Sequence, residues 1–438
     1  MTYEEAITRI QKQFTGVHLG LDRLEKLLDE LGNPERSGRY IHIAGTNGKG
    51  SIAAYITGAL MEAGYRVGTY TSPVVYEYGE QFRVNNRMIS HEDYIRLAET
   101  ICDAISRMQE KGYEAPSAFE RETALALLWY REQACDWIVL ECGLGGRTDA
   151  TNVIPSKCLA VFASISMDHM EYLGRTPADV ARVKAGIIKP GCTAVTSEQD
   201  PAVMEVLREE CEKQGVRLVT GRQSEAEWAD TSEDDKGSVP GSVIRYRGEI
   251  LESPLAGVCQ MQNMVTAWEA LKVLQEQGVN LTDEDIRRGI KNADWKGRFS
   301  PVCLRPLFIV DGAHNARAAQ ILRETLESYY PERRKIFIIG VFADKDYREV
   351  IRQTAPLADR IYTIETPDSD RALPAEELAR EIRNSGWQAE ACGSVEEAVE
   401  KAFEHAGDED LILSFGSLSN IGLITELAGR HVQKTERR

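Results

Sequence analysis

The sequence lacks the features of a membrane, secreted or nucleic-acid-binding protein. No apolar run approaches the roughly 20 residues that a helix needs to cross a bilayer, and the acidic start, MTYEEAITRI, is unlike a secretory signal. The nine cysteines include no C-x-x-C pair, and their odd number argues against a full disulfide framework. Basic residues are in the minority, because 69 Asp and Glu against 52 Lys and Arg give a net charge of −17. A basic surface for nucleic acid or anionic lipid is therefore not expected.

These absences predict a cytoplasmic protein whose cysteines are reduced. Several cysteines lie in apolar stretches, such as Cys158 and Cys303, and are expected to be buried thiols. The 438 residues are too many for one core, so two domains are expected. A hydrophobic content of 42% and a charged content of 28% are typical of a globular protein. We expect a monomer whose partners are small molecules.

The strongest functional signal is the stretch IHIAGTNGKGS at residues 41–51. A short apolar run enters a glycine-rich turn, and an amphipathic helix is predicted to follow. In such a strand–loop–helix unit, backbone N–H groups and the positive helix end bind phosphate. Lys49 would neutralise the β- and γ-phosphates, and Ser51 would hold Mg²⁺. The spelling departs from G-x-x-x-x-G-K-[ST], because Ile43 replaces the first glycine and Gly50 separates Lys49 from Ser51.

Polar groups at the ends of two further predicted strands complete a candidate metal site. Trp137–Glu141 is apolar and ends in a carboxylate, and Cys158–Ile165 leads into Asp168-His169. An acid at the tip of a neighbouring strand is the usual partner of the metal of a bound nucleotide. We therefore expect Ser51, Glu141 and His169 to bind Mg²⁺ around the phosphates of ATP.

A lysine in a predicted helix has unusual neighbours. The helix is capped by Thr176, and its Lys184 is followed by the small and apolar residues 185–188. Most helix lysines are solvated. If this one is desolvated, its pKa falls and its amine can react with CO₂ to form a carbamate, an additional anionic ligand near a metal.

The order of predicted elements indicates an α/β fold in two parts. Strands and helices alternate to about residue 220, which predicts a mostly parallel sheet with helices on both faces. The acidic residues 222–242 read as a solvated loop or hairpin, and Asn292–Pro301 is the expected linker. We expect a P-loop-type ATPase domain at residues 1–297 and a smaller Rossmann-like α/β domain at residues 298–438. In the second domain, strands are predicted near Leu307–Val310, Lys335–Val341, Arg360–Ile364 and Leu411–Phe415, and helices from about Asn315, Asp346, Pro374 and Ser394.

The second predicted domain has its own polar cluster. Asp311 and His314 follow its first strand and precede a helix. Arg298, in the linker, is placed to reach a phosphate, although most linker arginines are simply solvated. Ser417 follows another strand of this domain and is expected near the same polar cluster.

Motifs along nearly the whole chain resemble those of the Mur ligase superfamily, and specifically of folylpolyglutamate synthase/dihydrofolate synthase. The resemblance is carried by GTNGKGS (45–51), YTSP (70–73), SAFERETALA (117–126), ECGLGGRTDATN (141–152), DHMEYLG (168–174), KAGIIKPG (184–191), QMQN (260–263), WKGR (295–298), DGAHN (311–315) and DKD (344–346). Any one of them is weak evidence, but their number and order are specific to the family.

The resemblance implies an ATP-dependent amide ligase that adds L-glutamate to dihydropteroate, to (tetrahydro)folate polyglutamates, or to both. Transfer of the ATP γ-phosphate to a carboxylate of the pterin-bearing substrate gives an acyl phosphate. The glutamate amine then attacks the acyl carbon, and phosphate leaves. The implied cofactors are ATP and Mg²⁺, and the implied partners are pteroate or folate, L-glutamate and ATP.

The resemblance also implies roles for individual residues. ATP would be bound by Gly45, Thr46, Asn47, Gly48, Lys49, Gly50, Ser51, Asn263, Arg298 and Asp311, and Mg²⁺ by Ser51, Glu141 and His169. The catalytic groups would be Lys49, Lys184, Arg298 and His314, with Lys184 at the position of the family's carbamylated lysine. The substrates would contact Thr71, Ser72, Pro73, Phe119 and Ser417, and the incoming glutamate would lie near His314 and Ser417.

Several positions depart from the family pattern, but none is a phosphate, metal or carbamate ligand. The departing residues are Val74, Gln81, Val183, Cys259, Ser300 and Ala316. Those at 74–82 lie in the loop that shapes the pterin pocket in the family, so a Mur-superfamily ligase acting on a different carboxylic acid is the alternative. A nucleotide-binding regulatory protein without catalysis is a further alternative, which the retained ligand and catalytic residues argue against.

Overall fold

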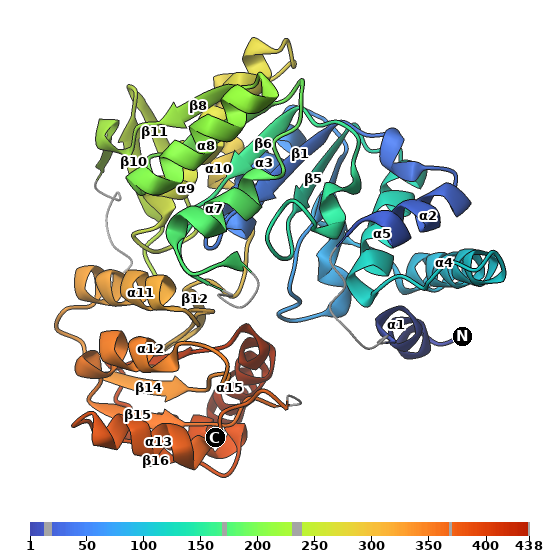
Figure 1. Ribbon diagram of the computed structural model, residues 1–438. Coiled ribbons are helices and arrows are strands. Elements are labelled where there is room, and N and C mark those ends of the chain that lie inside the picture. Colours follow the sequence, from blue (N-terminus) through green and yellow to red (C-terminus); the bar gives the residue numbers. More distant parts are fainter. Residues whose placement is uncertain (13–19, 169–172, 230–238, 368–369, 437–438) are drawn as a thin grey trace. The chain divides into compact units, whose positions relative to one another are not determined.

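The computed structural model describes residues 1–12, 20–168, 173–229, 239–367 and 370–436 (Figure 1). Internal packing divides the chain into two compact units. Unit 1 comprises Met1–Pro73, Gly79–Ala226 and Gln262–Asn292, and unit 2 comprises Val74–Tyr78, Glu227–Met261 and Ala293–Arg438. None of the described helices is both long enough and apolar enough to cross a membrane.

Unit 1 is built on a sheet whose described strands have the order β4-β3-β2-β5-β1-β6-β7-β8. The strands are β1 (Tyr40–Ala44), β2 (Val67–Tyr70), β3 (Phe82–Val84), β4 (Arg87–Met88), β5 (Trp137–Glu141), β6 (Leu159–Phe162), β7 (Thr193–Ser197) and β8 (Arg217–Gly221). Along this order, every neighbouring pair in the run β2-β5-β1-β6-β7-β8 is parallel. β3 pairs antiparallel with β2 and with β4, so β3 and β4 form an antiparallel edge. The carboxyl ends of β5, β1 and β6 therefore lie side by side, where open α/β sheets bind ligands.

Helices of unit 1 begin largely where the sequence signals predict. They are α1 (Tyr3–Gln11), α2 (Asp22–Glu30), α3 (Lys49–Glu62), α4 (His91–Glu110), α5 (Ala118–Glu132), α7 (Pro177–Ala185), α8 (Pro201–Gln214), α9 (Gln260–Glu276, in unit 1 from Gln262) and α10 (Asp283–Lys291). Ser90 caps α4 by accepting from Asp93 N–H, and Thr176 forms a capping box with Asp179 at α7. Helix α7 packs beside α8 (Figure 1).

Helix α3 is not the amphipathic helix that the sequence predicts, because it is buried on nearly all sides. One face packs on the sheet, and the opposite face packs on α10 at a pair of glycines. A Cβ on Gly58 would lie 2.5 Å from Gly289 O, and a Cβ on Gly289 would lie 2.1 Å from Ala59 N. Only glycine at both positions permits so close a crossing. Helix α10 therefore covers the face of α3 that the amphipathic pattern predicted to be exposed to solvent.

The acidic segment after β8, predicted as a solvated loop or hairpin, has strands at both of its described ends. It includes β9 (Ala226–Trp228), which forms a sheet with β10 (Ser242–Tyr246) and β11 (Glu249–Ser253) in the order β11-β10-β9. Residues 230–238 lie outside the described part of the chain. The short 3₁₀ helices of the chain are η1 (Pro34–Arg36), η2 (Tyr78–Gln81), η3 (Ala150–Val153), η4 (Gln223–Glu225), η5 (Ala355–Leu357) and η6 (Leu418–Asn420).

Unit 2 contains a second mostly parallel sheet, with the strand order β12-β13-β17-β14-β15-β16 over the described residues. Its strands are β12 (Ser300–Leu304), β13 (Leu307–Val310), β14 (Lys335–Ile339), β15 (Arg360–Thr363), β16 (Glu390–Ala391) and β17 (Leu411–Phe415), and its helices are α11 (Ala316–Tyr329), α12 (Tyr347–Thr354), α13 (Ala375–Asn384), α14 (Val395–His405) and α15 (Ile421–Glu436). The four predicted strands and four predicted helix starts are confirmed. The edge strands β12 and β16 and helix α15 were not predicted.

The core of unit 2 lies on both faces of this sheet. Along β13, Leu307 and Ile309 join one buried cluster, while Phe308 and Val310 join the other. Alternate side chains of a strand point to opposite faces, so a fully apolar strand signals a sheet that is covered on both sides.

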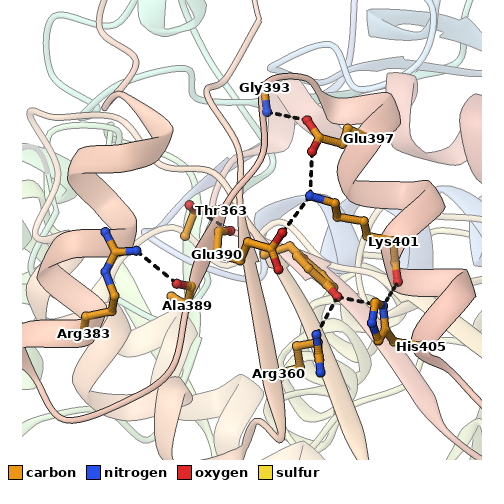
Figure 2. A network of polar contacts seen from close by, with 10 residues as sticks. Arg360, Thr363, Arg383, Ala389, Glu390, Gly393, Glu397, Lys401 and His405 are labelled. Atoms are coloured by element: carbon orange, nitrogen blue, oxygen red, sulfur yellow. Dashed lines mark hydrogen bonds and ion pairs between the residues drawn. The ribbon is translucent and has the colours of Figure 1, made fainter.

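A polar network joins the outer edge of this sheet to α14 (Figure 2). Lys401 Nζ donates to Glu390 Oε1 at 2.7 Å and to Glu397 Oε1 at 2.6 Å. The Tyr362 hydroxyl lies 3.0 Å from His405 Nδ1. Most of these groups are solvent-accessible, so the network orients the edge strand more than it stabilises the fold, and salt should weaken it.

All nine cysteines are free, but two are more exposed than predicted. Cys158 precedes β6 and Cys303 lies in the edge strand β12, and both are only partly buried. An edge strand has a neighbour on one side only, which the local apolar pattern does not reveal.

Candidate functional site

The glycine-rich stretch forms a turn between β1 and α3. Gly45 and Gly48 have φ of 151° and 91°. A Cβ on Gly45 would lie 2.7 Å from Ala163 Cβ, so this position has no room for a side chain. Thr46 N–H donates to Ser164 O at 2.7 Å, and Thr46 Oγ1 donates to Ser166 O at 2.9 Å. The segment after β6 therefore anchors the turn.

Helix α3 starts at Lys49, and Gly48 provides no side-chain cap for it. The first N–H groups of a helix lack partners within the helix, and here they follow a strand that ends at the ligand-binding edge of the sheet. Asn263, in α9, lies against this turn, since a Cβ on Gly48 would lie 2.3 Å from its Oδ1. This geometry suits a phosphate group.

Three charged side chains converge on the turn. Lys49 Nζ lies 3.6 Å from Glu141 Oε1, at the end of the neighbouring strand β5. Lys184 Nζ donates to Gly45 O at 2.8 Å from the last turn of α7. Lys184 is 5% exposed, and burial, reinforced by the charge of Lys49, lowers its pKa to about 8. The predicted desolvation of Lys184 is confirmed, and its carbamylation stays a prediction.

The predicted metal ligands can be placed only in part. Ser51 and Glu141 are both buried, at the start of α3 and at the end of β5. His169 lies outside the described residues. Within the described residues, no group of three or more His, Cys, Asp or Glu side chains is arranged to hold a metal ion. A hydroxyl and a carboxylate at this edge of the sheet are hard oxygen donors, and that donor chemistry fits Mg²⁺.

The substrate residues predicted in unit 1 lie on two neighbouring segments. Thr71 is buried and its N–H donates to Gln81 O at 3.2 Å. The peptide bond between Ser72 and Pro73 is cis. Phe119 stacks on Tyr70, with ring centroids 6.0 Å apart. A Cβ on Gly143 would lie 2.5 Å from the Phe119 ring, so this ring also covers the segment that follows Glu141.

The predicted residues of unit 2 form a second cluster after β13. Asp311 Oδ2 accepts from Phe299 N–H and Oδ1 from Ala313 N–H, both at 2.8 Å. The Arg298 guanidinium lies over Gly312, where a Cβ would come within 1.9 Å of Nη1. Burial raises the pKa of Asp311, and Arg298 opposes this.

His314 and Ser417 are both engaged with nearby backbone. His314 Nδ1 lies 2.7 Å from Gly312 O, so Nδ1 carries the hydrogen and donates it. Ser417 is buried and its Oγ accepts from Ser419 N–H at 3.2 Å, as the cap of η6. Ser300, which replaces an acid of the family pattern, accepts from Gly297 N–H at 3.0 Å and from Arg298 N–H at 3.2 Å.

Sequence reasoning missed a buried polar chain in unit 1. It runs through His42, Thr151, Asp149 and Lys157, all at most 5% exposed. The one local signal is a histidine in the middle of the otherwise apolar strand β1. Its partners are more than 100 positions away along the chain, and no local pattern points to them.

Comparison with known proteins identifies the family of both parts of the chain. The Mur ligase middle domain matches residues 43–271, and the glutamate ligase domain of Mur ligases matches residues 297–418. The dihydrofolate synthase/folylpolyglutamate synthase of Bacillus subtilis is 33% identical over 412 residues, which are 92% of this chain and 93% of that protein.

Solved structures of this group share the whole fold. Folylpolyglutamate synthase of Mycobacterium tuberculosis complexed with ADP has a TM-score of 0.87 and 28% identity, and covers 98% of this chain and 99% of its own. Escherichia coli FolC in complex with DHPP and ADP has a TM-score of 0.83 and 27% identity, covering 100% and 99%. The chain therefore belongs to the Mur ligase family, in its folylpolyglutamate synthase/dihydrofolate synthase group, and is an ATP-dependent ligase.

Proposed function

We propose that the protein adds L-glutamate to dihydropteroate, to a reduced folate, or to both. The γ-phosphoryl group of ATP passes to a carboxylate of the acceptor, giving ADP and an acyl phosphate. The glutamate amine attacks the acyl carbon, forms the amide bond and releases inorganic phosphate. The observation that carries this proposal is the convergence of Lys49, Glu141 and Lys184 on the glycine-rich turn.

The roles in nucleotide binding are proposed from the local geometry of unit 1 and from the family resemblance. Residues 45–51 hold the phosphates through backbone N–H groups, and Lys49 neutralises the charge that develops during transfer. Asn263, Arg298 and Asp311 are proposed to contact the nucleotide because they match nucleotide-contacting positions of the family. Ser51, Glu141 and His169 would hold Mg²⁺, which would supply positive charge to the phosphate oxygens.

Lys184 is proposed to act as a carbamate. Its amine has a pKa lowered to about 8, so a substantial fraction is neutral near that pH. A neutral amine can attack CO₂, forming an N–C bond and losing one proton to give a carbamate anion. Burial beside the phosphate turn would place this anion where the reaction takes place.

The remaining residues are assigned to the two other substrates. Thr71, Ser72, Pro73 and Phe119 are proposed to contact the acceptor, with the aromatic ring available for stacking. His314 and Ser417 are proposed to contact glutamate.

The functional division proposed is an ATP-binding domain at residues 1–297 and a C-terminal glutamate-ligase domain at residues 298–438. We further propose a monomer in the cytoplasm that acts on small molecules and not on nucleic acid or membranes. The nine free thiols and the net charge of −17 support this.

ADP release from the purified protein tests the function. The assay contains Mg·ATP and L-glutamate and compares dihydropteroate with tetrahydrofolate as acceptor. We expect glutamate-dependent turnover with at least one acceptor, and the pattern across the two distinguishes single from dual activity. Silence with both acceptors, despite measurable ATP binding, would contradict the proposed substrates and favour a different carboxylic acid.

A further inference from the structure

Next to the strand that leads into the phosphate turn, unit 1 contains buried polar side chains that the proposed reaction does not use. His42, in β1, is fully buried. Its Nδ1 lies 2.7 Å from Lys157 Nζ, and its Nε2 lies 2.8 Å from Thr151 Oγ1. The Thr151 hydroxyl in turn donates to Asp149 Oδ1. These four side chains form a continuous chain of hydrogen bonds, here called the His42 relay.

The chemistry of the groups assigns the hydrogens of the relay. Lys157 Nζ carries hydrogens whether or not it is protonated, and it also donates to Asn152 Oδ1 at 3.0 Å, so we assign its contact with His42 as a donation to Nδ1. Burial, reinforced by the charge of Lys157, lowers the pKa of His42 well below its usual value, so the ring is neutral. A neutral ring with an accepting Nδ1 carries its hydrogen on Nε2, which lies 2.8 Å from Thr151 Oγ1 and 3.1 Å from Cys142 Sγ. We assign the donation to the oxygen of Thr151, which is the nearer and the stronger acceptor. Every bond of the relay then points from Lys157 toward the Asp149 carboxylate.

Asp149 connects the relay to the segment that follows Glu141. Its Oδ2 accepts from Leu144 N–H at 2.7 Å, and its Oδ1 accepts from Thr151 N–H at 3.0 Å. One buried carboxylate therefore fixes both ends of this loop. Leaving a buried donor without an acceptor is costly, so the loop has a strong preference for this arrangement.

The same loop packs against the end of α7, where Lys184 lies. Arg147 N–H donates to Val183 O at 3.0 Å, and Asn152 Nδ2 donates to Gly186 O at 3.2 Å. A Cβ on Gly146 would lie 2.7 Å from Lys184 O, so loop and helix are in direct contact. The position of the Lys184 amine at Gly45 O therefore depends on this loop.

We propose that His42 and Lys157 are positioning residues for the ligase reaction, which hold residues 142–153 against the end of α7 and thereby keep the Lys184 amine at the phosphate turn. The catalytic part of this inference rests on the proposed function. The phosphate turn itself is anchored from elsewhere, through Ser164 and Ser166. Loss of the relay should therefore reduce turnover and leave nucleotide binding intact.

Matched substitutions separate this role from general support of the fold. Lys157→Met keeps the length of the side chain and removes both of its hydrogen bonds. Lys335→Met is the control, because Lys335 is a buried lysine of unit 2 whose Nζ also makes two hydrogen bonds, to Arg333 O at 2.7 Å and Pro331 O at 3.4 Å, away from the relay. His42→Gln retains one acceptor and one donor, whereas His42→Leu retains neither.

In the ADP-release assay, we expect Lys157→Met and His42→Leu to lower kcat at least tenfold, with KM for ATP within twofold of the wild type. His42→Gln should keep at least a third of the wild-type kcat, and Lys335→Met should stay within threefold. Equal losses in Lys157→Met and Lys335→Met, or a parallel rise in KM for ATP, would overturn the proposal. If Lys157→Met does not accumulate as folded protein, the two His42 variants give the same test.

Hydrogen exchange on the intact protein, read by mass spectrometry without substrates, tests the relay independently of turnover. We expect exchange in residues 142–153 and 183–189 to be at least tenfold faster in Lys157→Met than in the wild type or Lys335→Met. Exchange in residues 45–51 should be unchanged. Unaltered exchange in residues 142–153 would overturn the relay. A wild-type protein that shows no turnover would contradict the proposed function alone.

Discussion

Two strand-to-helix turns, one in each unit, start from the same local design and end in different chemistry. In both, a fully buried parallel strand, β1 or β13, leads through a short turn into a helix. Helix α3 has no side-chain cap at Gly48, whereas Asn315 caps α11 by accepting from Ala318 N–H at 2.9 Å. The second turn also closes on itself through Asp311, which accepts two backbone N–H groups.

The difference shows what makes a strand-to-helix turn a phosphate site. An uncapped helix start presents its backbone donors to a ligand, whereas a capped one has already used them. The first turn therefore offers backbone N–H groups and the ammonium of Lys49. The second offers side chains, chiefly Arg298 and His314, on a turn that needs no ligand to be complete.

The largest effect is expected from removing the charge of the first turn. Lys49→Ala should reduce kcat by about 10²–10³-fold or more, because positive charge near the transferred phosphoryl group is lost. The steady-state ADP-release assay measures this, and the thermal unfolding midpoint should change little. A near-normal rate would contradict the assignment of the ATP site to this turn.

Lys184→Ala should also lose most activity, but in a recoverable manner. If the missing group is a carbamate, short carboxylic acids added to the assay should partly restore turnover of this variant. They should not restore Lys49→Ala, which lacks a cation, and that variant is the matched control. An active Lys184→Ala protein, together with an unmodified Lys184 in the mass spectrum of the native protein, would rule out the carbamate.

Glycine substitutions compare the two turns directly. Gly48→Ala places a side chain at φ of 91° and against Asn263, and we expect a loss of about 1–2 kcal/mol of stability together with loss of ATP binding. Gly312→Ala meets the ends of the flexible Arg298 and Leu418 side chains. It should displace Arg298, raise KM for ATP and cost less stability. Urea unfolding and ATP titration of both variants measure this, and equal effects would contradict the contrast.

The smallest effect concerns the pH dependence of stability. Its sign differs between the buried lysines of unit 1 and Asp311 of unit 2. Burial lowers the pKa values of Lys157 and Lys184 to about 7 and about 8, from 10.5. Between those values and 10.5 the unfolded chain binds more protons than the folded chain, so their contribution to stability rises with pH. From pH 7 to 9, the stability of the wild type relative to Lys157→Met should rise by on the order of 1 kcal/mol.

The raised pKa of Asp311 should act in the opposite direction and in acid. Here the folded chain binds more protons than the unfolded chain just above pH 3.8, so this contribution falls as pH rises through that window. Urea unfolding of the wild type, Lys157→Met and Asp311→Asn across pH 4–9 measures both slopes. A flat difference for Lys157→Met between pH 7 and 9 would contradict its lowered pKa.

Much of the fold could be predicted because its signals are contiguous. Capping residues such as Ser90 and Thr176 mark helix starts within four positions, and apolar runs such as 336–339 mark buried strands. The two-residue strand β16 has too few residues to show a period. The second buried face of α3 depends on Gly289, more than 200 positions away.

The candidate site likewise divides into features that contiguous sequence patterns predict and features that depend on distant positions. The amino-acid sequence by itself determined the phosphate turn, the carboxylate at the tip of β5 and the small neighbours of Lys184, because each is a local pattern with a chemical meaning. Only the tertiary structure decided that Lys184 reaches Gly45 O and that a neutral His42 links Lys157 to Asp149. Burial and hydrogen bonding set these states, and both depend on groups that the chain brings together from distant positions.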